Sequence, residues 1–123
     1  MNENSWGWHL AIDASGLNHQ AITSKETIAA FAKKLVNDID MIAFGEPQVV
    51  HFGEGNKEGF TLVQLIETSN ICAHFNNIDD TGYIDVFSCK PFEKKIVLKV
   101  VKEFFGTKTL KYKSKMWDRN APR

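Results

Sequence analysis

Residues 59–89, GFTLVQLIETSNICAHFNNIDDTGYIDVFSC, decide the fold that we expect for this chain. Three runs in this stretch, 60–66, 70–75 and 83–89, alternate between two sets of side chains in the way that is typical of strands with one buried face. The run of polar residues at 76–82 predicts a turn. Short links join neighbouring antiparallel strands, so the stretch predicts a three-stranded antiparallel sheet.

The segment before this stretch predicts a strand, a helix and a further short strand. Residues 6–13 alternate between large apolar and smaller or polar side chains, which indicates a half-buried strand. Thr23 and Glu26 have the spacing of a capping box, which predicts that a helix begins there. Residues 47–52 form a short β-prone run. The apolar residues of the expected helix follow a spacing of three and four: Ile28, Phe31, Ala32, Leu35, Val36 and Ile39.

The segment after this stretch predicts a second helix and a last strand. Pro91 suits the first position of a helix because that position needs no backbone donor, and Gly106 suits the C-terminal cap. Residues 109–113 predict an edge strand. Residues 116–123 show no pattern, and we expect them to be mobile. The apolar face of this second helix is expected to contain Phe92, Ile96, Val97, Val100, Val101 and Phe104.

The order of these elements is strand, helix, three or four strands, helix and strand. It predicts an α+β two-layer sandwich, in which an antiparallel sheet carries both helices on one face. A chain of 123 residues is long enough to bury one core, so we expect a single domain over residues 1–123.

Composition and charge exclude several classes of function. Fifteen basic residues balance fifteen acidic residues, which argues against a nucleic acid or an anionic membrane as partner. No apolar run approaches the roughly 20 residues that span a bilayer. Residues 1–5 lack the pattern of a signal peptide, and the two cysteines are expected to be free thiols. We therefore expect a cytoplasmic protein.

A few side chains remain as candidates for chemistry. The sequence contains neither a glycine-rich phosphate loop nor a Gly-x-Ser-x-Gly nucleophile motif. Cys72, His74 and Cys89 could in principle bind a metal, but no paired metal-binding motif supports this, and we expect none. Ser69, His74 and Cys89 could instead converge at one end of the sheet. By themselves these residues are more typical of a turn serine and a structural histidine.

The same residues give the sequence its resemblance to a known family. The chain resembles the bacterial and archaeal S-adenosylmethionine decarboxylase proenzymes, which are pyruvoyl-dependent. Ser69 follows Gly59 by ten residues, His74 follows Ser69 by five, and Cys89 follows after fifteen more, without gaps. Residues 7–13 also resemble the first strand of the family. The matching pieces are Gly59-Phe60-Thr61, Thr68-Ser69-Asn70, Ala73-His74-Phe75 and Ile84-Asp85-Val86-Phe87-Ser88-Cys89.

The resemblance implies a self-processing lyase. The chain would cut itself between Thr68 and Ser69 into a β chain (1–68) and an α chain (69–123), and Ser69 would become the pyruvoyl cofactor. His74 is implied as the base of this processing, and Thr61 as a hydroxyl that assists it. The resemblance also implies Schiff-base chemistry with the substrate, Cys89 as the thiol that protonates the product, and a homodimer with shared active sites.

Three residues depart from the pattern of the family. Thr68 stands before the serine, where the family has glutamate, and Asn70 stands after it, where the family has histidine. Ile78 replaces a glutamate that is expected to bind the ribose hydroxyls of S-adenosylmethionine. Asp79 or Asp80 could supply a carboxylate there instead. Phe52 matches the aromatic residue that stacks on adenine.

Three functions therefore follow from the sequence as alternatives. The first is decarboxylation of S-adenosylmethionine for polyamine (spermidine) biosynthesis. The second keeps the pyruvoyl chemistry but acts on a basic amino acid such as arginine or ornithine, whose distal cation would face Asp79 and Asp80. The third is a non-catalytic binding module in which Ser69 stays intact.

Overall fold

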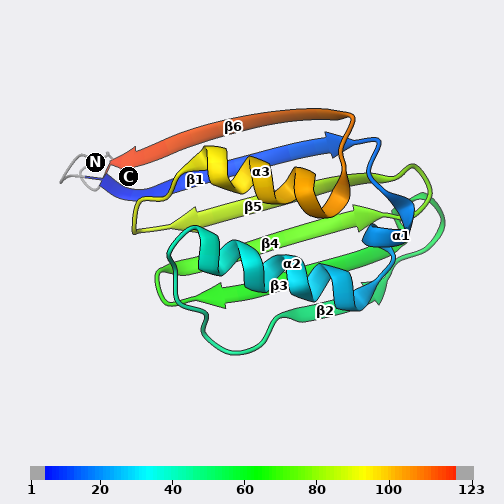
Figure 1. Cartoon of the computed structure of the whole chain (residues 1–123), viewed down its shortest axis with the longest axis horizontal. Helices are drawn as coiled ribbons and strands as arrows, with labels where there is room; N and C mark the ends of the chain where they lie inside the picture. Colours follow the sequence, from blue (N-terminus) through cyan, green and yellow to red (C-terminus); the bar gives the residue numbers. More distant parts are fainter. Residues whose placement is uncertain (1–4, 119–123) are drawn as a thin grey trace.

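Six strands form one antiparallel sheet in the computed structural model, which describes residues 5–118 (Figure 1). The strands lie in the order β2-β3-β4-β5-β1-β6. The fold class predicted from the sequence, an α+β sandwich with an antiparallel sheet, is confirmed. The strands are β1 (Ser5–Ser15), β2 (Gln48–Phe52), β3 (Gly59–Ile66), β4 (Ser69–Asn76), β5 (Thr81–Ser88) and β6 (Thr109–Asp118).

The three strands expected from residues 59–89 are present and pair as neighbours. Ile66 pairs with Ser69 across the first link, and Ser69 pairs with Ser88 in the next strand. Side chains alternate along β4 between a buried set and a half-buried set. The buried set is Ile71, Ala73 and Phe75, and the half-buried set is Asn70, Cys72 and His74. The two sets therefore lie on opposite faces of the sheet.

Helices cover one face of the sheet only (Figure 1). They are α1 (His19–Ile22), α2 (Lys25–Asp38) and α3 (Lys94–Phe105). Phe105 of α3 is fully buried, and its ring centre lies 4.9 Å from that of Phe31 in α2 and 4.8 Å from that of Phe75 in β4. These three rings join both long helices to the middle of the sheet. Full burial of aromatic rings is among the largest single contributions to a core.

The start of α2 differs from the sequence-based prediction. Its N-cap is Ser24, whose hydroxyl accepts the Thr27 N–H at 3.1 Å, and not Thr23. Thr23 instead closes α1, a short helix that the sequence pattern did not predict, and its hydroxyl donates to the His19 carbonyl at 2.7 Å. Thr23 and Ser24 are both suitable N-caps. Because Thr23 ends α1, Ser24 is the residue left to cap α2.

The predicted ends of α3 and of the last strand also need correction. α3 begins after its N-cap Glu93, three residues later than Pro91 suggests, because Phe92 first turns inward and is 7% exposed. Gly106 ends the helix with φ 57°, as predicted. β6 extends to residue 118 because it pairs with β1 along almost all of that long strand. Residues 119–123, in which we also expected mobility, lie outside the described residues.

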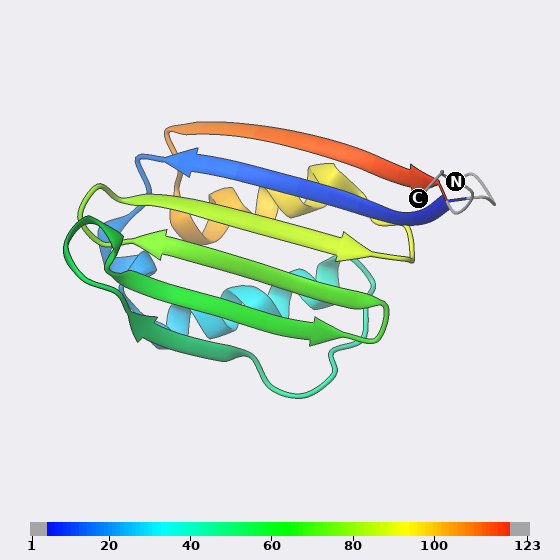
Figure 2. The ribbon, with the colours of Figure 1, turned by 180° about the vertical axis from the view of Figure 1, so that it is seen from behind.

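The other face of the sheet carries no helix (Figure 2). We call it the open face, and it has two ends that matter below. The Ser69 end contains the start of β4 and Cys89, which follows β5. The His74 end contains Phe52, Thr61 and His74, which come from β2, β3 and β4.

The backbone of β3 approaches the end of β4 so closely at Gly59 that no side chain fits there. A Cβ atom at this position would overlap the Phe75 carbonyl oxygen. We expect Gly59→Ala to lower the free energy of unfolding by about 1–3 kcal/mol, the usual cost of overpacking. Gly55→Asn is the control, because nothing lies within 4 Å of a Cβ at Gly55 and asparagine tolerates its φ of 59°. Urea unfolding measures both, and an unchanged midpoint for Gly59→Ala would contradict this packing.

Candidate active site

The bond between Thr68 and Ser69 lies at the end of the β3–β4 link, beside the end of β5. The backbone N–H of Cys89 donates a hydrogen bond to the Thr68 carbonyl oxygen at 3.1 Å. This contact follows from the register of the two strands. Ser69 pairs with Ser88, so Thr68, which precedes Ser69, lies opposite Cys89, which follows Ser88. The structure therefore brings Thr68, Ser69 and Cys89 together, as the sequence suggested.

A second set of contacts fixes the side chain of Thr68. Its hydroxyl lies 2.7 Å from the hydroxyl of Ser88, which is fully buried. The Ser88 hydroxyl also accepts the backbone N–H of Lys90 at 3.0 Å. Ser88 thus links the residue before Ser69 to the segment that contains Cys89. The sequence analysis did not single out Ser88. The alternation along β5 places it on the buried face, where a hydroxyl needs a hydrogen-bond partner, and this could have identified it.

The side chain of Ser69 is half-buried at the start of β4. Its hydroxyl oxygen accepts a hydrogen bond from the Asn70 side-chain amide at 3.2 Å. Asn70 in turn accepts a weak hydrogen bond from the Cys72 thiol, with a sulfur–oxygen distance of 3.7 Å. A residue that departs from the family pattern therefore orients the candidate nucleophile, and sequence reasoning had given it no role.

A separate group of side chains lies at the His74 end of the open face. The Thr61 hydroxyl and the Nδ1 atom of His74 lie 2.8 Å apart, on strands that pair these two residues directly. The ring of Phe52 is 6.2 Å from the ring of His74 and is 54% exposed. The structure thus places Phe52, Thr61 and His74 side by side, so that a hydroxyl, an imidazole and an exposed aromatic ring face the same space.

Within one chain, the structure does not bring His74 to Ser69, which corrects the expectation that both would converge at one end of the sheet. The two residues are five positions apart on β4. At about 3.3 Å per residue, that spacing separates their Cα atoms by roughly 16 Å, which is beyond the reach of an imidazole. Cys89 stays close to Ser69 because β5 runs antiparallel to β4 and returns to the Ser69 end.

Asp79 and Asp80, the candidate carboxylates for substrate, lie in the β4–β5 turn and already have partners. Asp79 accepts hydrogen bonds from the Thr81 N–H and from the Thr81 hydroxyl. Asp80 has φ 57°, and its carboxylate lies 2.6 Å from the Nδ1 atom of His19. Ile78 beside them is 65% exposed. The turn therefore presents one apolar side chain and two carboxylates, of which Asp79 bonds to Thr81 and Asp80 contacts α1.

An acidic centre lies in the middle of the open face. The Nε2 atom of His9 is 2.9 Å from both carboxylate oxygens of Asp85. Partial burial, and then the charge of Asp85, raise the pKa of the Cys72 thiol above its usual range. The same two causes raise the pKa of Tyr83, whose hydroxyl is 3.5 Å from Asp85. Both groups are therefore held in their neutral forms at neutral pH.

The residues that the structure describes show neither a metal centre nor a membrane-spanning helix. No group of three or more histidine, cysteine, aspartate or glutamate side chains in residues 5–118 is arranged to hold a metal ion. Cys89 lies at the opposite end of the sheet from His74, so these two do not form a site together with Cys72. No helix within the described range is long and apolar enough to cross a bilayer.

Comparisons with known proteins indicate the family to which this chain belongs. Residues 8–119 match the model of the S-adenosylmethionine decarboxylase family. The S-adenosylmethionine decarboxylase proenzyme of Clostridium botulinum strain Langeland is 30% identical over 98 residues, which cover 79% of this chain and 81% of the relative. The corresponding protein of strain Loch Maree is 29% identical over the same share.

A solved structure has the same fold. The crystal structure of the adenosylmethionine decarboxylase from Aquifex aeolicus VF5 superposes with a TM-score of 0.80 at 18% identity, covering 94% of this chain and 92% of the other. The match to the family model spans most of the chain and includes Ser69, His74 and Cys89. The chain therefore belongs to the S-adenosylmethionine decarboxylase family, a family of carboxy-lyases.

Proposed function

We propose that this chain is a pyruvoyl-dependent S-adenosylmethionine decarboxylase that cuts itself between Thr68 and Ser69. The observation that most directly supports the cut is the 3.1 Å hydrogen bond from the Cys89 N–H to the Thr68 carbonyl oxygen. A donor on this oxygen stabilises the negative charge that develops when a nucleophile adds to the carbonyl carbon. The bond that has to react is therefore already polarised in the uncut chain.

Self-cleavage is a rearrangement of this one bond. The Ser69 hydroxyl oxygen attacks the Thr68 carbonyl carbon, the peptide C–N bond breaks, and an ester replaces it. Removal of the Ser69 α-proton then expels the Thr68 carboxylate and leaves a dehydroalanine at position 69. Water hydrolyses this residue with loss of ammonia, which leaves a pyruvoyl group on residues 69–123 and a free carboxylate on residues 1–68. The side chain of Thr68 forms and breaks no bond, which is consistent with threonine at this position.

The surroundings of position 69 fit a pyruvoyl group. Ser69 begins a strand, is half-buried, and has the Cys89 segment directly beside it. When formed, the pyruvoyl carbonyl supplies an electron sink for decarboxylation. Cys89 is the candidate proton donor to the substrate carbon, because it is the thiol that lies next to this position. Its backbone polarises the bond to be cut, and its side chain is free for a separate role.

The base for processing comes from a second copy of the chain in this proposal. His74 and Thr61 are too far from Ser69 of their own chain, yet they are already paired with each other. A two-fold axis parallel to the sheet and perpendicular to its strands, placed just above the open face, would lay two open faces together. The His74 end of one chain would then face the Ser69 end of the other. Each site would combine Ser69 and Cys89 from one chain with the pair from its partner.

The open face has the surface that such a homodimer needs. It has no helical cover, and several large apolar side chains on it are 44–54% exposed. Exposed apolar patches of this kind commonly mark protein interfaces. Trp6 packs edge-on against Phe87 at the Ser69 end, with ring centres 6.3 Å apart. The exposed apolar residues of this face include Trp6, Val50, Phe52, Leu65 and Tyr83.

The substrate in this proposal is S-adenosylmethionine, and the pathway is polyamine (spermidine) biosynthesis in the cytoplasm. The exposed ring of Phe52 beside His74 supports a substrate with a planar base, because aromatic rings stack on such groups. A basic amino acid remains the second candidate, since Ile78 offers no ribose ligand and two carboxylates follow it in the turn. Release of CO₂ from S-adenosylmethionine, arginine and ornithine, measured side by side on the processed protein, decides between the two.

The first prediction concerns the cut itself. We expect intact-mass analysis of the purified protein to give two fragments, 1–68 and 69–123, the second lacking a free N-terminal amine. Ser69→Ala should give one full-length chain because no hydroxyl can attack the Thr68 carbonyl. A wild-type chain that stays at full-length mass after long incubation would refute both catalytic functions and favour a binding module.

The second prediction separates the two roles of Cys89. Cys89→Ala keeps the backbone N–H that reaches Thr68, so we expect normal cleavage. Decarboxylation should slow about 100-fold or more, the usual contribution of a proton-transfer residue. Mass analysis follows the first step and CO₂ release the second. Cys72→Ser is the matched control, and full turnover in Cys89→Ala would remove the proposed role of the thiol.

The third prediction tests the shared site. Ser69→Ala and His74→Ala should each stay uncut when produced alone, because one lacks the nucleophile and the other the base. In dimers that contain one chain of each kind, the His74→Ala chain should be cut by its partner's imidazole. Mass analysis identifies the cut chain because its 69–123 fragment is lighter by the difference between histidine and alanine. If mixed dimers form and no fragment appears, His74 does not act across the interface.

A further inference from the structure

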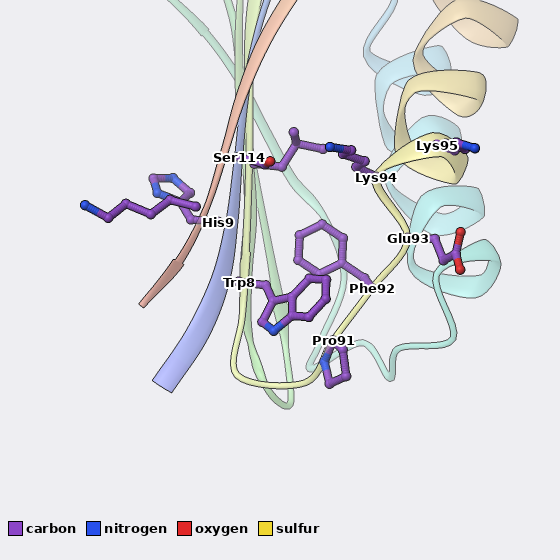
Figure 3. Close-up of a pocket in the computed structure, with 10 residues that line it drawn as sticks. Trp8, His9, Pro91, Phe92, Glu93, Lys94, Lys95 and Ser114 are labelled. Carbon is purple, nitrogen blue, oxygen red and sulfur yellow. The ribbon is translucent and has the colours of Figure 1, made fainter. Parts of the chain in front are cut away.

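A pocket of about 510 Å³ lies on the helix side of the sheet, between β1, β6 and the start of α3. Trp8 and Phe92 form its wall, with ring centres 6.4 Å apart. Figure 3 shows these two rings next to each other, with the side chain of His9 on the opposite side of the strands. The pocket is therefore separated from the open face, and neither the processing step nor the decarboxylation described above uses it.

The lining of this pocket combines apolar walls with a cation. Trp8, Leu10, Pro91 and Phe92 supply the apolar surface, and the polar residues of the lining are His9, Glu93, Lys94, Lys95, Ser114 and Lys115. Lys94 extends from α3 toward β6, where its ammonium nitrogen lies 5.4 Å from the centre of the Tyr112 ring (Figure 3).

The neighbours of Lys94 on the chain do not share its direction. Glu93 and Lys95 point away from the two rings (Figure 3). No acidic residue other than Glu93 lines the pocket within the described part of the chain. The charge directed into the pocket is therefore positive.

The backbone at the start of α3 adds to this positive potential. Glu93 is the N-cap of the helix, but its side chain makes no capping hydrogen bond. The first N–H groups of a helix have no partner within the helix and form the positive end of its dipole. An anion near Lys94 would meet both the ammonium group and this helix end.

We propose that this pocket binds a small anion, a carboxylate or phosphate, that carries an apolar body. The apolar body would pack against Trp8 and Phe92, and the anionic group would lie at Lys94 and Ser114. The volume lies within the range of roughly 300–1,000 Å³ that is usual for small-molecule sites.

The pocket shares a segment of chain with the candidate active site. Pro91 and Phe92 follow Cys89 by two and three residues. The Cys89 N–H is held by the Thr68 carbonyl, and the Lys90 N–H by the Ser88 hydroxyl. A ligand packed on Pro91 and Phe92 restrains this segment and so slows reactions of the Cys89 thiol. An effect on decarboxylation rests on the proposed function, but the binding does not.

The test uses the Ser69→Ala chain, so that the result does not depend on self-cleavage. The probe is 4-phenylbutyrate, and the readout is the NMR signal of the Trp8 indole N–H, assigned by Trp8→Phe. We expect a saturable shift with a Kd on the order of 1 mM, as for a ligand of this size. The neutral analogue 4-phenyl-1-butanol should bind more weakly. Absence of a saturable shift, or equal affinity for the two compounds, would overturn the proposal.

Two matched variants test the position of the charge. Lys94→Gln should weaken 4-phenylbutyrate binding by at least about threefold, the effect of losing one partly exposed charge partner. Lys95→Gln removes the same charge from a side chain that points away, and should leave the affinity unchanged. Equal losses in both variants would mean that only net charge matters, and would contradict the site.

The link to Cys89 has its own measurement. Cys72→Ser leaves Cys89 as the one thiol of the chain, so the rate of alkylation by iodoacetamide reports on Cys89 alone. Saturating 4-phenylbutyrate should lower this rate by about twofold or more through reduced access. The Lys94→Gln variant should need more ligand for the same effect. A rate that does not respond to bound ligand would exclude the coupling between the pocket and the active-site segment.

Discussion

The alternation of side chains along β3, β4 and β5 is the constraint on which the other features of this protein depend. Because successive residues of a strand face opposite sides, Ile71, Ala73 and Phe75 can enter the core only if Cys72 and His74 lie on the open face. A slip of the register by one residue would exchange the two sets and would bury a histidine. The aromatic contacts of Phe105 with Phe31 and Phe75 stabilise this register, because they pack both long helices against one face of the sheet.

The same constraint explains why the candidate site is divided. Antiparallel pairing returns Cys89 to the Thr68–Ser69 bond, while the direction of β4 carries His74 to the other end of the sheet. One chain thus contains two separate groups of candidate residues, one around the Thr68–Ser69 bond for which we propose the cut, and one with the hydroxyl–imidazole pair of Thr61 and His74. Two open faces related by a two-fold axis would bring these two groups together. The apolar side chains that remain exposed on this face support that arrangement.

The segment after β5 connects the two sides of the sheet. Its backbone holds Thr68 at the edge of the open face, and within three residues it forms the wall of the pocket beneath α3. Buried Ser88 anchors this segment through Thr68 and Lys90. A chain segment with contacts on both sides of a sheet is a short physical route by which binding on one side can influence a reaction on the other.

The sequence by itself determined the strands of residues 59–89, the two long helices, the fold class and the family, because alternation, helical spacing and the positions of Ser69, His74 and Cys89 are local properties of the chain. It also indicated that Cys89 would meet Ser69, since hairpin pairing follows from short links. It misplaced the start of α2 because Thr23 and Ser24 are both suitable N-caps. It misplaced the start of α3 because Phe92 is buried before the helix begins.

Only the tertiary structure decided which face of the sheet the helices cover, how far β6 pairs with β1, and which polar atoms meet. The contact of buried Ser88 with Thr68 and the pairing of His9 with Asp85 both depend on register and packing. These contacts join segments that are far apart in the chain, and no local pattern of residues encodes them.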